Sequence, residues 1–162
     1  MALKFKKMKR FIYIISCIAA TVMMASSCEK ETVEISNVDH AVAGVWHLTS
    51  STAEGNSFDL YDVYLHLAPE GDFELYQKSG SQSRYDKYTG TFTTAEGIIN
   101  GVYSDGRPWG SKYTYTVTEQ ALVLKSFNLL EEQKYQRSEL PDDVIDNANA
   151  VVTKSEGNTP IL

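Results

Sequence analysis

Short β-rich runs recur along the chain from Gly44 to about residue 138, and turn residues separate them roughly every 8–12 positions. The turns are rich in glycine, which permits the positive φ that tight hairpins require. No helix-sized spacer of the kind that joins parallel strands lies between the runs. This pattern predicts an antiparallel all-β domain, a barrel or a sandwich, with strands near residues 44–51, 59–67, 72–78, 84–94, 97–104, 109–118, 120–126 and 132–138.

Apolar and polar residues alternate within these runs, so each predicted strand has one apolar face and one polar, solvent-facing side. Between residues 109 and 118, Tyr113 and Tyr115 share a side with Trp109, while Thr114 takes the other side. The same period assigns a set of side chains to the interior, where they are candidates for ligand binding. These residues are Val63, Leu65, Phe73, Leu75, Tyr88, Phe92, Tyr103, Trp109, Tyr113, Tyr115, Leu122 and Leu124.

The pattern changes after the last predicted strand. Pro141, Asp142 and Asp143 are residue types that favour a helix N-terminus. Apolar residues then recur at roughly helical spacing, at Val144, Ile145, Ala148, Val151 and Val152. We therefore predict a short amphipathic helix over residues 141–152, packed on the outside of the barrel or across one end of it, and a flexible tail over residues 153–162.

The N-terminal segment has the three parts of an export signal. Five basic residues lie within the first ten, an apolar stretch runs from Phe11 to about Ala25, and small residues lead into Cys28. The apolar stretch is shorter than the roughly 20 residues of a membrane-spanning helix. The junction resembles the lipobox of bacterial lipoproteins, which implies cleavage after residue 27 and a diacylglycerol on the Cys28 thiol. A permanent single-span anchor and an ordinary secretory cleavage site are the alternatives.

The cysteine count fits this prediction. The chain has two cysteines, and Cys17 lies inside the predicted signal, so Cys28 has no partner for an intramolecular disulfide after cleavage. Residues 28–42 are polar and acidic and are typical of a tether. The expected organisation is a signal over 1–27, a tether over 28–42, one domain over 43–152 and the tail. The expected location is the bacterial envelope, lipid-anchored to the outer membrane and facing the periplasm or the surface.

Charge narrows the possible partners. Cleavage would remove five of the 15 basic residues and none of the 21 acidic ones, so the net charge would fall from −6 to −11. An acidic domain repels phosphate backbones and anionic headgroups. The sequence therefore argues against nucleic-acid binding, and membrane attachment is expected to come from the lipid on Cys28.

An ordered set of motifs resembles the lipocalin and lipocalin-like families, especially the lipocalin-like domains of bacterial envelope lipoproteins. The motifs are Gly44-Val45-Trp46, Gly71–Tyr76, Tyr88–Phe92 and Gly101–Gly110, followed by Arg137 near the end of the last predicted strand. The resemblance implies an eight-stranded antiparallel up-and-down β-barrel, with the short C-terminal helix added. It also implies that Arg137 lies across Trp46 at the closed base of the barrel, where Gly44 opens the first strand.

The sequence offers no recognisable catalytic set. The histidines, His40, His47 and His66, are scattered, and no nucleophile elbow, phosphate loop or zinc motif occurs. We therefore predict a non-enzyme without a metal or cofactor. One hypothesis is a barrel that binds a small apolar or amphiphilic ligand. The other is a filled barrel that contacts an envelope protein or glycan through loops such as 79–84 and 105–110, because eight strands enclose little more than their own side chains.

Overall fold

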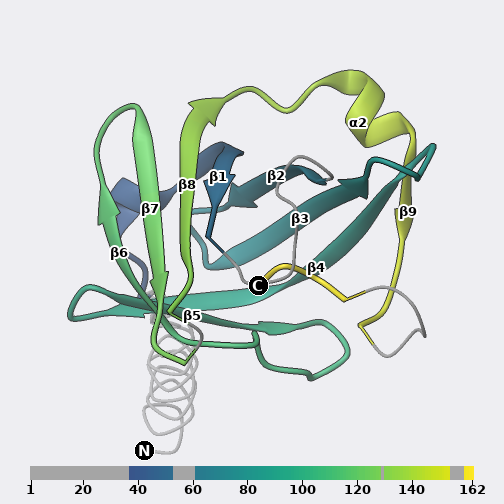
Figure 1. The fold of residues 1–162 in the computed structure, drawn as a ribbon. Coiled ribbons are helices and arrows are strands. Elements are labelled where there is room, and N and C mark those ends of the chain that lie inside the picture. The colour runs from purple at the N-terminus through teal and green to yellow at the C-terminus, as the bar shows by residue number, and fades with distance from the viewer. Residues whose placement is uncertain (1–36, 53–60, 129, 154–158) are drawn as a thin grey trace, which may run out of the picture. The chain divides into compact units, whose positions relative to one another are not determined.

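The computed structural model describes residues 37–52, 61–128, 130–153 and 159–162. Eight antiparallel strands form a closed barrel in which each strand pairs with the next, and the first pairs with the eighth (Figure 1). The predicted fold class is confirmed. The strands are β1 (Gly44–Ser51), β2 (Tyr61–Leu67), β3 (Asp72–Ser79), β4 (Tyr85–Ala95), β5 (Ile98–Tyr103), β6 (Tyr113–Val117), β7 (Ala121–Ser126) and β8 (Glu132–Ser138).

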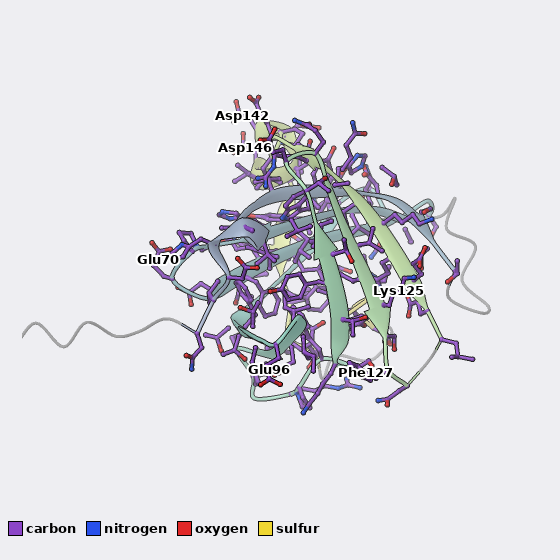
Figure 2. All side chains as sticks on the ribbon, turned by 90° about the vertical axis from the view of Figure 1, so that its left-hand side faces the viewer. Glu70, Glu96, Lys125, Phe127, Asp142 and Asp146 are labelled. Carbon is purple, nitrogen blue, oxygen red and sulfur yellow. The ribbon has the colours of Figure 1, made fainter. Side chains whose placement is uncertain are left out.

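The alternation of each strand sorts its side chains as predicted. On β2, Val63, Leu65 and Leu67 are buried, while His66 between them is half-buried. Figure 2 shows side chains filling the space between the strands, with labelled carboxylates such as Glu96 at the periphery. The core of the domain is thus the interior of the barrel itself.

Strand β6 is shorter than the prediction of 109–118. The chain after β5 folds back on that strand, where Trp109 N–H donates to the Gly101 carbonyl and Tyr103 N–H donates to the Arg107 carbonyl. Because of these bonds, Trp109 belongs to the loop beside β5 and not to β6. Because Pro108 has no N–H to donate, the run could not have continued as a regular central strand.

One end of the barrel, the base, is closed by the short 3₁₀ helix η1 (His40–Val42). The Trp46 indole N–H donates to the Val42 carbonyl over 2.8 Å. The Arg137 guanidinium lies 4.1 Å from the centre of the Trp46 ring and donates to the carbonyls of Ala43 and Glu119. A side chain at Gly44, whose φ is +140°, would collide with this guanidinium.

The predicted tether over 28–42 is too long, because residues 37–42 belong to the barrel. Val38 and Val42 are buried in its core, and Thr94 N–H on β4 donates to the Asn37 carbonyl. Cys28 and the predicted signal lie outside the described residues. In the part of the chain that the structure describes, no helix is long and apolar enough to cross a membrane.

The predicted helix over 141–152 is present but ends early. Helix α2 (Asp142–Asp146) covers five residues, and the following strand β9 (Ala148–Ala150) pairs parallel with β4, with Ala148 opposite Tyr85. The prediction of helix beyond Asp146 is wrong. The early part of β4 pairs with β3 but not with β5, so it offers unpaired backbone groups that β9 takes up. This tertiary pairing overrides the local spacing of apolar residues.

The flexible tail predicted over 153–162 is wrong at both of its described parts. The Thr153 side chain is buried, and its N–H and hydroxyl both donate to one carboxylate oxygen of Asp105. Leu162 is also buried and belongs to the core of the barrel. Figure 1 accordingly places the chain end marked C within the outline of the barrel strands.

Candidate functional site

The candidate site is the interior of the barrel between the base and the opposite end, which we call the mouth. Eleven of the twelve predicted interior residues are buried with at most 4% of their surface exposed, and Tyr115 is partly buried against them. The structure therefore brings the predicted set together in one cluster. These side chains line the interior of the barrel and are withdrawn from solvent.

Aromatic rings meet one another across this cluster. Phe73 on β3 meets Tyr103 and Trp109 edge-to-face, with ring centres 5.5 and 5.2 Å apart. Trp109 meets Tyr113 in the same way at 6.2 Å, and Tyr88 meets Tyr103 at 6.0 Å. Edge-to-face pairs of this kind fix ring orientation and add about 0.5–1.5 kcal/mol beyond burial. The rings form a rigid lining whose polar tips hold defined positions.

The polar tips in this lining are hydrogen-bond donors at neutral pH. Burial raises the pKa of Tyr103 and of Tyr113 well above the ordinary tyrosine value, so both hydroxyls stay protonated. The Trp109 indole N–H is buried and has no hydrogen-bond partner among the described residues. A buried donor without an acceptor costs about 1–3 kcal/mol.

Three further side chains with hydrogen-bonding groups face the interior, and the sequence analysis did not include them. Gln77 continues the inward alternation of Phe73 and Leu75 on β3, and Gln133 and Tyr135 occupy the inward side of β8. Tyr135 donates its hydroxyl to Gln133 over 2.5 Å, and Gln133 donates to Glu131 over 2.7 Å. The period-two pattern contained this signal, but glutamine is read as a surface residue when polarity alone is considered.

Residues 159–162 close the mouth. Gln77 donates to the Thr159 carbonyl over 3.1 Å and accepts from Ile161 N–H over 2.9 Å. Gln133 donates to the Ile161 carbonyl over 3.2 Å, and Tyr103 donates to the Leu162 backbone oxygen over 2.7 Å. Three strands of the barrel thus hold the backbone of this one segment.

A second polar cluster lies on the outer face. His47 and Tyr85 both hydrogen-bond to the Asp62 carboxylate, over 2.8 and 2.5 Å, and the His47 ring stacks on Tyr64 at 4.4 Å. The His47 side chain is partly exposed. Both Asp62 oxygens are engaged in these contacts. Within the described ranges, no group of three or more histidine, cysteine, aspartate or glutamate side chains is placed to hold a metal.

Comparison with known families identifies the domain. The model of the lipocalin-like domain family matches residues 42–124, which run from η1 through most of β7. The chain belongs to the lipocalin-like domain family. In this lipocalin-like chain the matched residues include Trp46 at the base and the aromatic lining, whereas Gln133, Arg137 and the segment that closes the mouth lie beyond the match.

Several solved structures are similar to this lipocalin-like chain. Human cRBP IV is 14% identical, with 60% of this chain and 98% of that chain covered and a TM-score of 0.38. The "REP1-NXSQ fatty acid transporter" is 12% identical, with 64% and 100% covered and a TM-score of 0.38. Lipid binding protein 8 of Caenorhabditis elegans is 12% identical, with 62% and 99% covered and a TM-score of 0.36. No curated protein matches the chain.

Proposed function

We propose that this chain is a lipid-anchored protein of the bacterial envelope that binds a small apolar or amphiphilic ligand in its lipocalin-like barrel. The observation that supports the proposal is the Trp109 indole N–H, buried among the aromatic lining without an acceptor in the described structure. An acceptor oxygen on a ligand would satisfy this donor, while its apolar part would pack on Phe73 and Tyr113.

The ligand is tested by native mass spectrometry of the purified chain after incubation with a cell lipid extract. We expect a defined extra mass that disappears on denaturation. The Trp109→Phe variant keeps an aromatic ring but loses the N–H donor. We expect it to retain at most about a tenth of the bound mass. A buried hydrogen bond is worth about 0.5–1.5 kcal/mol, and its loss would also leave the acceptor of the ligand buried without a donor.

Phe127→Ala is the matched control, because Phe127 is an aromatic residue that is 55% exposed outside the barrel. This variant should bind as much ligand as the unaltered chain. Equal uptake by Trp109→Phe would remove Trp109 from the proposed site. A bare polypeptide mass under every condition would contradict ligand binding altogether.

The lipid anchor is proposed from the resemblance of residues 25–28 to a lipobox. Two or three acyl chains hold a protein stably at a membrane, whereas a domain of net charge near −11 has no electrostatic attraction to anionic headgroups. The Cys28→Ala variant is therefore expected to remain unprocessed or to leave the membrane fraction for the soluble fraction. Membrane fractionation followed by mass measurement checks this, and an anchored, processed Cys28→Ala protein would refute the assignment.

A filled barrel that contacts an envelope protein or glycan through its loops is the second candidate function. The burial of interior side chains such as Leu65, Leu75 and Leu124, which have no exposed surface, supports this alternative. The loop after β5 is a candidate for such a contact. Its conformation is fixed by Asp105, whose carboxylate accepts hydrogen bonds from the N–H groups of Arg107 and Thr153. A partner that is lost when this loop is altered would support the alternative.

A further inference from the structure

The contacts of residues 159–162 are those of a bound peptide. Gln77 holds the segment at two backbone positions, the Thr159 carbonyl and the Ile161 N–H. A side-chain amide that donates to one residue and accepts from the residue two positions later recognises extended backbone, whatever the side chains are. Gln133 and Tyr103 add donors to the next two backbone oxygens, of Ile161 and Leu162.

Side-chain selectivity comes from the end of the segment. Leu162 is only 3% exposed and lies in the main core with the aromatic lining, and Ile161 packs against the same core. Thr159 is exposed, while Pro160 and Ile161 are half-buried. The mouth therefore takes aliphatic side chains at the two positions that contact the core, Ile161 and Leu162.

Gln77 needs an occupant at the mouth. It is 7% exposed, both of its amide atoms bond to the segment, and buried amide groups of this kind are almost always hydrogen-bonded. The amide of Gln133 is also held by Glu131 and Tyr135, so Gln133 adds a contact to the segment without depending on it. Both glutamines project from strands whose own ladder is complete, so they stay in place if the segment leaves. Tyr103 contacts Phe73 and Tyr88 as well as Leu162, so it links the mouth directly to the aromatic lining.

We propose that the mouth of the barrel is a binding site for an extended peptide with an aliphatic pair, occupied here by residues 159–162 of the same chain. The segment acts as a displaceable plug, and a ligand reaches Trp109 and Tyr103 only when the plug leaves. The second part of this proposal rests on the proposed function, whereas the peptide site stands without it.

The peptide site is tested with the full chain in lipid nanodiscs and a variant that lacks residues 159–162. The probe is the hexapeptide Gly-Asn-Thr-Pro-Ile-Leu, which has the sequence of residues 157–162. We expect the shortened variant to bind this peptide saturably, and we expect the bound peptide to slow amide hydrogen exchange in β3 and β8. The intact chain should bind at least tenfold less, because its own segment competes at an effective concentration in the millimolar range.

Plug release is tested in the same nanodiscs with lauric acid as the probe and bound mass as the readout. The shortened variant and Leu162→Asp should bind at least tenfold more lauric acid than the intact chain, and the hexapeptide should reduce this uptake in the shortened variant. Val152→Asp is the matched control, since it places the same charge at an aliphatic residue that is 51% exposed in the same part of the chain. If the shortened variant fails to fold, Leu162→Asp decides the result.

The outcomes separate this proposal from the proposed function. Peptide binding without lauric acid binding in any variant would support the peptide site and count against the apolar ligand. Equal lauric acid binding by all variants, with no effect of the peptide, would overturn the plug and leave the apolar ligand supported. Absence of peptide binding by a folded, shortened variant would overturn the peptide site.

Discussion

Replacement of Trp46 by alanine is expected to lower the free energy of unfolding by about 3–5 kcal/mol, the range for removal of a fully buried large aromatic side chain. Trp46 has no exposed surface, and its indole carries the Arg137 guanidinium on one side. Its loss also removes the hydrogen bond to Val42, which holds η1 across the base. Urea unfolding followed by far-ultraviolet circular dichroism measures this change.

Two further variants identify which part of the Trp46 contact matters. Trp46→Phe keeps an aromatic face for Arg137 but removes the donor to Val42, so the expected cost is smaller than for alanine. Phe127→Ala, at an aromatic residue that is 55% exposed, should change stability by less than about 0.5–1 kcal/mol. A cost for Trp46→Ala no greater than for Phe127→Ala would show that the base does not depend on the indole.

Replacement of Gly90 by alanine should have the second largest effect on stability, at least about 1–3 kcal/mol, because the new Cβ has no space. It would collide with the Val102 carbonyl oxygen on β5 and lie 2.8 Å from the Tyr103 Cα. Both are backbone atoms of the paired strand, so the clash is relieved only by opening the β4–β5 pair. Thermal unfolding of the variant beside the unaltered chain measures the loss.

Gly110→Ala is the matched control for Gly90→Ala. A Cβ at Gly110 meets only the Leu162 backbone, at an ordinary van der Waals distance of 4.0 Å. Alanine there should be neutral or slightly stabilising, because it restricts the unfolded chain. If Gly90→Ala and Gly110→Ala gave the same melting temperature, the close approach of β4 and β5 at Gly90 would be wrong.

The predicted strands succeeded because their signal is local. A period of two places Val63 and Leu65 inside regardless of what lies opposite them, and the predicted bounds of β1 and β8 agree with the structure. The interior set was likewise predictable from alternation, including Phe73 and Tyr113 on strands far apart in sequence. What remained open was whether those side chains surround a ligand or fill the barrel.

Residues after β8 show the limit of local patterns. Val144 keeps its predicted helical position and packs with Tyr76 and Tyr85 on the outer face. Val151, which fits the same helical spacing, instead donates its N–H to the Lys87 carbonyl beside β4. The spacing of apolar residues was compatible with a longer helix and with a strand beside β4. The strand forms because it pairs with backbone groups of β4 that have no other partner strand.

The sequence by itself determined which residues face inward, where most strands begin and end, and that the fold is antiparallel, because each of these depends on neighbours within a few residues. Only the tertiary structure decided that β9 fills the edge of β4 and that residues 159–162 close the mouth. β9 bonds to backbone groups of β4, and residues 159–162 bond to the side-chain amides of Gln77 and Gln133, so both arrangements use groups from distant positions in the sequence. Their need for partners arises only when the closed barrel removes them from water.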